Sequence, residues 1–580
     1  MQETKSTCPY CGVGCGVIIE SHGPQITGVR GDPTHPANFG RLCTKGSTLH
    51  LTASSPITLQ TRLLQPLRRA QRGDAPQPLS WDAALGLATE KFADIIQRHG
   101  PNAVGFYVSG LLLTEDYYVF NKLAKGLIGT NNIDTNSRLC MSSAVAGYKQ
   151  TLGADAPPAC YDDVKHAQCL FIVGSNAAWA HPILFRRIED ARAANPGMKV
   201  IVADPRRTDT AGMADLFLPI QPGSDVMLFN GMLHIMLWEG WIDAAYIGAH
   251  TTGFDELKAL VREATPERAA QVCGISVADL TTAAKWFATS KATLSLYCQG
   301  LNQSSSGTAK NATLINLHLA TAQIGKPGAG PFSLTGQPNA MGGREVGGLA
   351  NLLSAHRDLA NPQHRAEVAA LWGVADVPSQ PGKTAVEMFQ AAADGEIKAL
   401  WIACTNPAQS MPDQATVRRA LQRAEFVVVQ EAFATAATCA FADLLLPATT
   451  WGEKTGTVTN SEWGEVLIGK DFGLFARSNI LLDELLAGYG QVSDTLGLVD
   501  GGGVSFGNIG SGYPYPFPTS QITYRTPLMD GLRVAVGIMD PVDTNDDSDV
   551  GKAYQEAIAR ILGDDIEITV PKAPKQGLID

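Results

Sequence analysis

The chain has 580 residues, of which 45% are hydrophobic and 17% charged, and its formal net charge at pH 7 is −11. This length and composition are typical of a globular protein with several buried cores, and they exclude a disordered or fibrous chain. The acidic balance, without a basic stripe interleaved with aromatic residues, argues against nucleic acid binding. Because no apolar run is long enough for a transmembrane helix, we expect no membrane insertion.

Four cysteines open the chain, at the spacing Cys-x2-Cys-x3-Cys with a fourth after 27 intervening residues. Thiolates at such short intervals can converge on one iron–sulfur cluster, and a [4Fe–4S] cube needs four of them. Structural zinc usually takes its cysteines as two Cys-x2-Cys pairs, which this spacing does not match. The sequence therefore predicts a [4Fe–4S] cluster held by Cys8, Cys11, Cys15 and Cys43.

The N-terminal segment indicates the cellular compartment of the protein. Residues 1–7 run directly into the cysteine motif and contain neither a hydrophobic signal core nor a twin-arginine sequence. A disulfide framework is not expected in so long a chain without a signal peptide, and isolated thiols suit a reducing compartment. We therefore expect a cytoplasmic protein.

Beyond the cysteine motif, the pattern alternates between helices and strands. Ser80 is expected to cap a helix that ends at Gly100. The buried side of this helix is expected to carry Leu85, Ala88, Phe92, Ile95 and Ile96. Apolar strands are expected at residues 103–108, 169–173, 199–203, 294–297, 400–403 and 426–429. The alternation predicts an α/β fold, with a small N-terminal [4Fe–4S] domain followed by doubly wound parallel-sheet domains.

Polar residues follow several of these strands, and in a doubly wound sheet ligands bind beyond the carboxyl ends of the strands. Small turns there bring backbone amides to a phosphate, Asp can accept from a ribose or a purine edge, and Arg can pair with phosphate. The candidate residues are Gly174, Ser175, Asn176, Asp204, Arg206, Arg207, Gln221, Gly223, Asp225, Thr405 and Asn406. Each alone has an ordinary structural explanation, but their succession favours a dinucleotide-type ligand.

A glycine-rich segment at residues 335–345 offers a second kind of contact. Its glycines permit close backbone approach to a large flat ligand, and its polar side chains supply donors. Without those side chains, a flexible loop would be the default interpretation. The candidate cofactor-binding residues are Gly336, Gln337, Met341 and Gly342, with Arg344 beside them.

Together these motifs resemble those of the molybdenum-bis(pyranopterin guanine dinucleotide) oxidoreductases, the family that contains bacterial nitrate reductases and formate dehydrogenases. The resemblance extends from about Cys8 to Glu462 and is strongest to the cytoplasmic assimilatory nitrate reductases. It implies bis-molybdopterin guanine dinucleotide and molybdenum as cofactors, held by the candidate segments. It also implies that Lys45 lies between the cluster and a pterin on the electron path.

The resemblance gives Cys140, in Ser137–Ser143, the role of protein thiolate ligand to molybdenum. A soft thiolate suits a metal already held by four dithiolene sulfurs, and it would tune the metal's electronics. A lone cysteine is otherwise more often buried and inert. That is our interpretation of the remaining six, which are Cys160, Cys169, Cys273, Cys298, Cys404 and Cys439.

The implied reaction is the two-electron reduction of nitrate to nitrite by oxygen-atom transfer, with electrons entering through the cluster. A ferredoxin, a flavodoxin or an NADH-linked reductase would fit the family as electron donor. Arg138 and Arg344 are candidate catalytic residues that supply positive charge for the anion. Either arginine could equally pair with a carboxylate or a cofactor phosphate.

Two alternatives stay open. Formate dehydrogenases resemble this chain through the same motifs, but they typically place histidine directly after the metal-ligating residue. Here that neighbour is Met141, which cannot take part in proton movement and so favours nitrate. The non-catalytic alternative is a cluster-bearing electron-transfer protein without molybdenum, against which Cys140 and the dinucleotide-type segments argue.

The resemblance ends near residue 462, and the expected domains follow from it. They are a cluster domain at 1–58, a discontinuous α/β domain at 59–135 and 331–462, a second dinucleotide-cofactor α/β domain at 136–330, a β-rich segment at 463–556 and a tail at 557–580. The β-rich segment resembles a fragment of an outer-membrane porin instead of the family's C-terminal domain. Strands at 522–526 and 532–538 are expected to pair, but they are too few to close a barrel. Because the family's C-terminal domain closes over the pterins, we expect the second pterin to be exposed here.

Overall fold

The computed structural model describes residues 1–23, 25–54, 60–459, 466–471, 519–525 and 535–539. The chain divides into two compact units. One consists of Met1–Gly469 with Ile522–Gly537, and the other of Lys470–Gln521 with Ile538–Asp580. The first unit contains nearly all of the described residues and every residue that we predicted to belong to a functional site.

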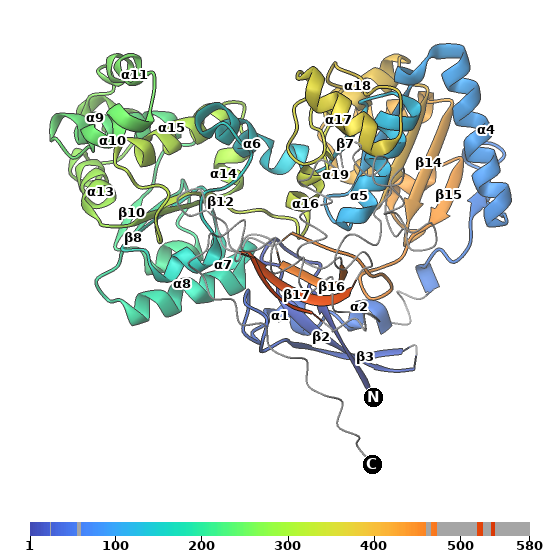
Figure 1. Ribbon diagram of the computed structural model, residues 1–580, viewed down its shortest axis with the longest axis horizontal. Coiled ribbons are helices and arrows are strands. Elements are labelled where there is room, and N and C mark those ends of the chain that lie inside the picture. The colour runs from blue at the N-terminus through green and yellow to red at the C-terminus, as the bar shows by residue number, and fades with distance from the viewer. Residues whose placement is uncertain (24, 55–59, 460–465, 472–518, 526–534, 540–580) are drawn as a thin grey trace, which may run out of the picture. The chain divides into compact units, whose positions relative to one another are not determined.

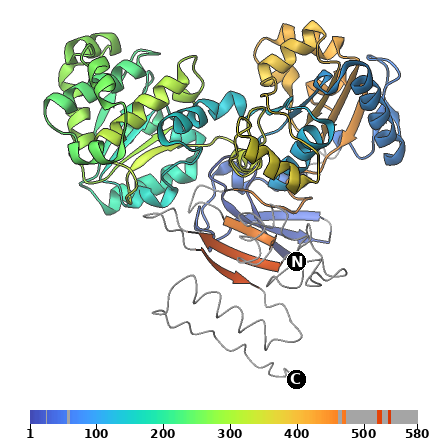
Figure 2. The same ribbon diagram turned by 45° about the horizontal axis from the view of Figure 1, so that its top comes forward.

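The N-terminal sheet is dark blue in Figure 2, and the first three cysteines lie in the loop between its first two strands. Its antiparallel strands are β1 (Gln2–Thr7), β2 (Gly16–His22) and β3 (Gln25–Gly31). Thr7 pairs with Gly16 at the end of the β1–β2 hairpin, so Cys8 and Cys15 leave the sheet side by side. The short helix α1 (Thr44–Ser47) begins directly after Cys43.

A five-stranded sheet follows, with the order β10-β9-β8-β11-β12 and every neighbouring pair parallel. Its strands are β8 (Cys169–Val173), β9 (Lys199–Ala203), β10 (Leu216–Leu218), β11 (Thr293–Tyr297) and β12 (Gly330–Ser333). Leu170 and Ile172 pack with helix α8 (Pro182–Ala194) on one face. The other face is covered by α9 (Asp225–Trp238), α13 (Val277–Thr289) and α15 (Gly307–Ala320) (Figure 1).

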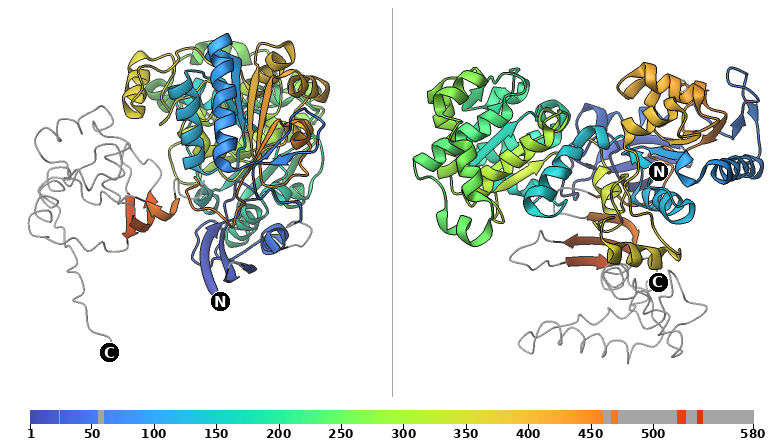
Figure 3. Two further views of the ribbon diagram at one scale, coloured as in Figure 1. Left: turned by 90° about the vertical axis from the view of Figure 1, so that its right-hand side faces the viewer. Right: turned by 90° about the horizontal axis from the view of Figure 1, so that it is seen from above.

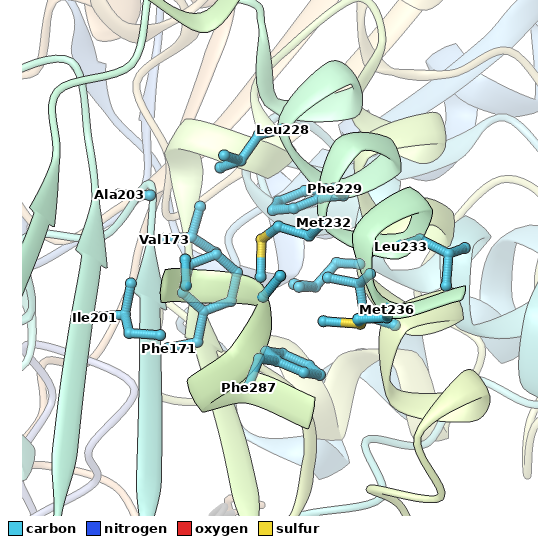
Figure 4. Close-up of a cluster of buried hydrophobic side chains, with 14 of the residues drawn as sticks. Phe171, Val173, Ile201, Ala203, Leu228, Phe229, Met232, Leu233, Met236 and Phe287 are labelled. Carbon is cyan, nitrogen blue, oxygen red and sulfur yellow. The ribbon is translucent and has the colours of Figure 1, made fainter. Parts of the chain in front are cut away.

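Packing on that second face is dense. Figure 4 shows Phe171 and Val173 of β8 pointing toward Phe229 and Met232 of α9 and Phe287 of α13. The ring of Phe171 meets those of Phe229 and Phe287 edge to face, at centroid distances of 6.0 and 5.9 Å. Because both faces of the sheet are covered, its central strands β8, β9 and β11 are continuous apolar runs, which is why the sequence located these three, whereas β10 and β12 were not predicted.

A seven-stranded sheet forms the second α/β layer, in the order β5-β4-β15-β14-β13-β6-β7. Its parallel strands are β6 (Val104–Val108), β7 (Ile133–Thr135), β13 (Ala399–Ala403), β14 (Phe426–Glu431) and β15 (Leu444–Pro447). The short strands β4 (Leu67–Arg68) and β5 (Gln77–Pro78) extend one edge in antiparallel fashion. Helix α4 (Trp81–His99; blue in Figure 3, left) covers one face, and α18 (Ala385–Asp394) and α20 (Gln414–Arg423) pack on the other. The predicted doubly wound parallel architecture is confirmed.

Helix α4 begins and ends where the sequence predicted, but its buried face differs by one residue. The Ser80 hydroxyl accepts from the Ala83 amide at 3.2 Å, and Gly100 ends the helix. Leu85 is 46% exposed, so its predicted burial is wrong. The buried stripe starts instead at Ala84, which is aligned with Ala88 at a spacing of four residues, whereas Leu85 is rotated by about 100° from it.

The remaining helices of the described residues connect these layers. The α-helices are α2 (Leu51–Ser54), α5 (Thr114–Asn121), α6 (Arg138–Leu152), α7 (Ala177–Ala180), α10 (Ala244–His250), α11 (Phe254–Val261), α12 (Pro266–Cys273), α14 (Gln299–Asn302), α16 (Ala340–Glu345), α17 (Pro362–Trp372) and α19 (Pro407–Ser410). The 3-10 helices are η1 (Pro101–Ala103), η3 (Tyr161–Lys165), η4 (Asp209–Met213) and η5 (Ala437–Phe441), and η2 (Lys122–Ile128) is a π-helix. Within the ranges given above, no helix combines the length and apolarity that a membrane span requires.

Three strands near the C-terminus form a sheet of their own, in the order β16-β17-β18. They are β16 (Val466–Asp471), β17 (Thr519–Arg525) and β18 (Ala535–Met539). The two strands predicted at 522–526 and 532–538 correspond to β17 and β18, which are neighbours. Most of the predicted porin-like segment and the whole tail lie outside the described residues.

One buried histidine makes the fold sensitive to acid. His318 of α15 lies 2.9 Å through Nδ1 from the Gln323 carbonyl and 2.7 Å through Nε2 from the Ser295 hydroxyl. A carbonyl can only accept, so Nδ1 carries the proton and Nε2 accepts from Ser295. Burial lowers the pKa of His318 to about 3.

We therefore expect stability to fall as the pH drops below about 6.5, because the unfolded chain binds a proton that folded His318 does not. The loss is about 2 kcal/mol between pH 6.5 and 5 for this group. His318→Gln should reduce the change by that amount, measured by urea unfolding at both pH values. The exposed His22→Gln variant should behave like the parent protein. An equal pH dependence in His318→Gln and the parent would contradict the assignment.

Candidate active site

The loop between β1 and β2 carries three of the four predicted cluster ligands. The Cys8 amide donates to the Cys15 carbonyl at 2.8 Å, and the Gly14 amide to the Cys11 carbonyl at 3.1 Å. Gly14 has φ of +61°, a left-handed conformation that favours glycine. Cys8 and Cys15 are each 6% exposed, whereas Cys11 is half-buried. The loop is therefore a tight, internally bonded turn.

The four thiols lie close enough to influence one another. Burial raises the pKa of Cys8 to about 12, and it raises those of Cys11 and Cys15; negative charge on the neighbouring cysteines, Cys43 included, raises them further. Lys45 acts in the opposite direction on Cys8 and Cys11. Thiolates in this partly buried loop thus require added positive charge, which iron supplies, and the donor set fits a cluster.

The cysteines are not arranged for a single ion. All eleven are free, so none is engaged in a disulfide. Within the ranges that the structure describes, no group of three or more His, Cys, Asp or Glu side chains could hold one metal ion. The ligands of a cube bind four different irons, so their sulfurs need not converge on one point.

Lys45 lies on α1, with its ammonium 5.7 Å from the centre of the Tyr10 ring. It also lines a cavity of about 750 Å³ together with Cys43, Ala178, Pro182 and Arg186. The cavity thus lies between helix α1 and the segment that follows strand β8. A ligand in it would contact both.

That segment contains two buried polar atoms without a hydrogen-bond partner among the described residues. They are Ser175 Oγ and His181 Nδ1, and these two residues are 4% and 0% exposed. His181 Nε2 lies 2.7 Å from the Thr335 carbonyl, and burial lowers the pKa of this histidine. Unpaired buried polar atoms are rare, so these two fit a polar cofactor. His181 is a residue that the sequence analysis missed.

Cys140 is the third residue of α6 and is 8% exposed. The Gln299 side-chain amide donates to its sulfur at 3.4 Å, and the Gly336 backbone also interacts with it. A Cβ built on Gly336 would lie 3.4 Å from the Cys140 sulfur and 3.0 Å from Gln299 Nε2. Burial raises the pKa of Cys140, while Gly336, Gln299 and Arg344 favour the thiolate. A thiolate at this position is therefore surrounded by donors and one cation.

The segment at residues 335–336 connects Cys140 to the cluster loop. The Gly12 amide donates to the Gly336 carbonyl at 3.1 Å, and the Tyr161 hydroxyl donates to the Gly12 carbonyl at 2.9 Å. A Cβ on Gly12 would overlap the Thr335 carbonyl. Backbone therefore approaches backbone directly between the two predicted metal-binding regions.

Both candidate arginines pair with buried carboxylates. Arg138 Nε lies 2.9 Å from Asp134 Oδ2, and its Nη2 lies 2.8 Å from Asn351 Oδ1. Arg344 Nη1 lies 3.2 Å from Asp155 Oδ1. Of the interpretations left open for these arginines, the structure shows carboxylate pairing. Their positive charge is therefore partly neutralised.

Two of the turns predicted to bind a dinucleotide, those after β8 and β13, share the same strand–turn–helix structure. Strand β8 leads through Gly174 to Asn176 at the start of α7, and β13 leads through Cys404 to Asn406 at the start of α19. Gly174 and Cys404 share the left-handed conformation, with φ of +57° and +55°. Each asparagine then accepts a hydrogen bond from a threonine of the following 3-10 helix. Thr210 Oγ1 donates to Asn176 at 2.9 Å, and Thr438 Oγ1 donates to Asn406 at 2.7 Å.

The sequence analysis missed Thr210 and Thr438, although a signal for them exists. Ala-Asp-Leu-Phe-Leu-Pro at 214–219 and Ala-Asp-Leu-Leu-Leu-Pro at 442–447 are repeats of one motif. In each, the aspartate accepts from a strand amide at 2.8 Å, from Val200 to Asp215 and from Val427 to Asp443. The two sheets therefore present equivalent turns at the carboxyl ends of their strands.

The other candidates are distributed around these turns. The Asp204 carboxylate accepts from the Arg206 amide at 2.9 Å, and Arg207 stacks 5.2 Å from the Phe217 ring. Asp225 forms a buried ion pair with Lys310 at 2.7 Å. The Gln221 amide donates to the Cys273 carbonyl at 2.8 Å, and Gly223 has φ of +85°.

The glycine-rich segment and the second turn meet near α6. Gln337 lies 3.5 Å from the Ser137 hydroxyl, and Thr405 lies 3.5 Å from the Asn136 amide. A Cβ on Gly342 would come within 2.6 Å of Thr114 Oγ1, so only glycine fits there. Met341, next to Gly342 on α16, is half-buried. Candidates distant in sequence are thus gathered around the start of α6.

Comparison with known proteins agrees with this arrangement. Residues 62–465 match the model of the molybdopterin oxidoreductase family, and residues 1–55 match that of the molybdopterin oxidoreductase Fe4S4 domain. A nitrate reductase of Synechocystis sp. is 46% identical over 471 residues, covering 79% of this chain and 65% of the relative. One of Klebsiella oxytoca is 48% identical over 462 residues, covering 80% and 52%. The chain thus spans between half and two thirds of the length of these curated relatives.

More distant relatives are also matched. They include a periplasmic nitrate reductase of Desulfovibrio desulfuricans, 42% identical, and the alpha subunit of an F420-dependent formate dehydrogenase of Methanococcus maripaludis, 35% identical. Each alignment covers 78% of this chain, with 61% and 65% of the relative. Among solved structures, acetylene hydratase from Pelobacter acetylenicus has a TM-score of 0.65 at 22% identity, covering 79% of this chain and 65% of that one. This last likeness concerns the fold alone.

The contact between Gly12 and Thr335 can be tested by adding one methyl group. Gly12→Ala should destabilise the protein by about 1–3 kcal/mol through overpacking and lower its iron content. Iron per chain after anaerobic reconstitution and the thermal unfolding midpoint are the measurements. The control is Gly86→Ala in α4, where the new Cβ has no neighbour within 4 Å and helix propensity should improve by about 0.5–1 kcal/mol. Unchanged iron and stability in Gly12→Ala would show that the loop tolerates displacement.

Proposed function

Because the chain belongs to the molybdopterin oxidoreductase family, we propose that it reduces nitrate to nitrite. Family membership confirms the predicted cofactor classes, a 4Fe–4S cluster and molybdenum with pterin. The observation that carries the choice of substrate is the sequence identity of 46% and 48% to two nitrate reductases. Met141, directly after Cys140, supports it because methionine offers no proton-accepting group.

The reaction is NO3− + 2H+ + 2e− → NO2− + H2O. Molybdenum, when bound, would supply the two-electron redox chemistry of oxygen-atom transfer. We propose that Cys8, Cys11, Cys15 and Cys43 hold the cluster, and that Cys140 supplies the protein thiolate to molybdenum. The contacts of Gln299 and Gly336 with the Cys140 sulfur support this role, since both stabilise negative charge on it.

Electrons would pass from an external donor through the cluster toward Cys140. We propose Lys45 as the residue between cluster and pterin, supported by its place in the cavity shared with Cys43 and Pro182. Arg138 and Arg344 would hold the anion near Cys140, their charge moderated by Asp134 and Asp155. A ferredoxin, a flavodoxin or an NADH-linked reductase remains our proposal for the donor.

We propose that each repeated turn supports one of two guanine dinucleotide cofactors. The residues concerned are those predicted after β8 and β13 and in the glycine-rich segment, and the orphaned Ser175 hydroxyl supports the first of them. For the domains we propose 1–58, 59–135 with 331–462, and 136–330. Sheet membership supports this division, with the last junction shifted to the end of β12 at Ser333.

An assimilatory role in the cytoplasm is also proposed. Eleven free cysteines suit a reducing compartment. Because the relatives include a periplasmic enzyme, fractionation of the source cells is the test, and recovery from the periplasm would overturn this part.

Metal content and substrate choice test the central proposal. Anaerobically purified protein should contain about four irons and one molybdenum per chain, and it should reduce nitrate with a reduced dye faster than it oxidises formate. Iron without molybdenum would overturn the catalytic proposal, and faster formate oxidation would overturn nitrate as the substrate.

Three cysteine variants separate the two metal sites. Cys43→Ser should lower iron content, whereas Cys140→Ser should keep iron and lose at least about tenfold in activity. Cys273→Ser, in the apolar core beneath α9, should retain both metals and activity. Full activity in Cys140→Ser would contradict its role as a ligand.

A further inference from the structure

Lys125 is a lysine with no exposed surface, in the middle of the π-helix η2. Its ammonium donates to three backbone carbonyls, those of Gly347 at 2.6 Å, Leu349 at 2.9 Å and Leu352 at 2.7 Å. Three acceptors match the three N–H groups of a protonated lysine, and leave none unpaired. Burying an ammonium group is unfavourable without such partners, so the burial of Lys125 in place of an apolar residue indicates a specific structural role.

The three carbonyls belong to one loop, residues 347–352. Its ends are drawn together by a bridge between Val346 and Ser354 and by the Ala355 amide, which donates to the Glu345 carbonyl at 2.6 Å. The loop directly follows α16, the helix that carries Arg344. The Gly348 amide donates back to that helix, to the Gly343 carbonyl at 2.7 Å.

The same loop contacts the start of α6. Asn351 Oδ1 accepts from Arg138 Nη2 at 2.8 Å, and Arg138 is two residues before Cys140. On its other side, Arg138 pairs with Asp134, whose carboxylate also accepts from the Ala385 amide at 2.7 Å. Asp134 is fully buried. Burial lowers the pKa of Lys125 to about 7; the charge of Asp134 opposes this shift and that of Arg138 adds to it. Lys125, the loop and Arg138 therefore form one connected network.

We propose that Lys125 is a positioning residue that holds the 347–352 loop against η2 and thereby orients Arg138 beside Cys140. The use of this orientation in nitrate binding rests on the proposed function, whereas the clamp itself does not. The π-helical conformation of η2 supports this role for Lys125. Its wider turn is rare and usually marks a functional site, and here it carries the lysine into the loop.

Amide hydrogen exchange tests the clamp without any cofactor. In Lys125→Met, exchange at the Gly348 and Leu352 amides should become about tenfold faster, and so should exchange at the Cys140 and Met141 amides at the start of α6. The matched control is Lys122→Met, the same chemical change on the same π-helix, which should leave all four rates unchanged. Unchanged rates in Lys125→Met would overturn the proposal.

A second variant guards against a simple folding defect. Asn351 is exposed, so Asn351→Ala should fold normally and speed exchange at Cys140 and Met141 without affecting Gly348. The double variant should exchange no faster at Cys140 than Lys125→Met alone, because both changes act on one connection. Additive effects would mean that Lys125 stabilises the protein without acting through Asn351, and would overturn the positioning role.

Kinetics separate this inference from the proposed function. With the loaded parent protein reducing nitrate, Asn351→Ala should raise the KM for nitrate about fivefold and change kcat by less than about twofold. If the parent reduces no nitrate, the proposed function fails while the exchange measurements still decide the clamp. If exchange changes as expected but KM does not, the clamp stands and its role in anion binding is overturned.

Discussion

The hydrogen bond from the Gly12 amide to the Gly336 carbonyl joins the two ends of the candidate active site. On one side, Gly12 belongs to the loop that turns Cys8, Cys11 and Cys15 toward one another. On the other, Gly336 lies against the Cys140 sulfur. A Cβ on Gly12 would overlap the Thr335 carbonyl, and one on Gly336 would press against the Gln299 side chain at 3.0 Å. The loop that carries Cys8, Cys11 and Cys15 and the segment beside Cys140 are therefore joined by direct backbone contact and not through long, adjustable side chains.

Buried charge surrounds this contact and restricts how the site can move. Arg138 with Asp134, Arg344 with Asp155 and Lys310 with Asp225 are pairs largely removed from water. Removing one partner of such a pair typically costs about 3–5 kcal/mol, because the other charge is left unpaired. Arg344 with Asp155 and Lys310 with Asp225 join segments that are distant in the sequence, whereas Arg138 and Asp134 are four residues apart. Although desolvating these charges is unfavourable, the pairs fix the orientation of the arginine side chains near Cys140.

The repeated strand–turn–helix unit extends this order to both sheets. Asn176 with Thr210 and Asn406 with Thr438 build the same hydrogen-bonded turn at equivalent strand ends. In the first copy, glycine occupies the left-handed position, whereas in the second Cys404 adopts it at a cost in strain. Two copies of one turn agree with the proposed pair of dinucleotide cofactors. The repeat is visible in the sequence at residues 214–219 and 442–447, but its equivalence at the two strand ends appears only in the fold.

The sequence by itself determined the fold class, the positions of six apolar strands and the spacing of the N-terminal cysteines. These are local properties, because continuous apolar runs form doubly covered strands and closely spaced thiols need no distant partner. Tertiary structure alone decided which carboxylates the arginines meet, that Leu85 faces outward, and that Lys125 is buried among three carbonyls. In sequence, Lys125 is indistinguishable from Lys122. Only the approach of a loop more than two hundred residues away makes one of them an internal cation, since burial and pairing arise when distant segments come together.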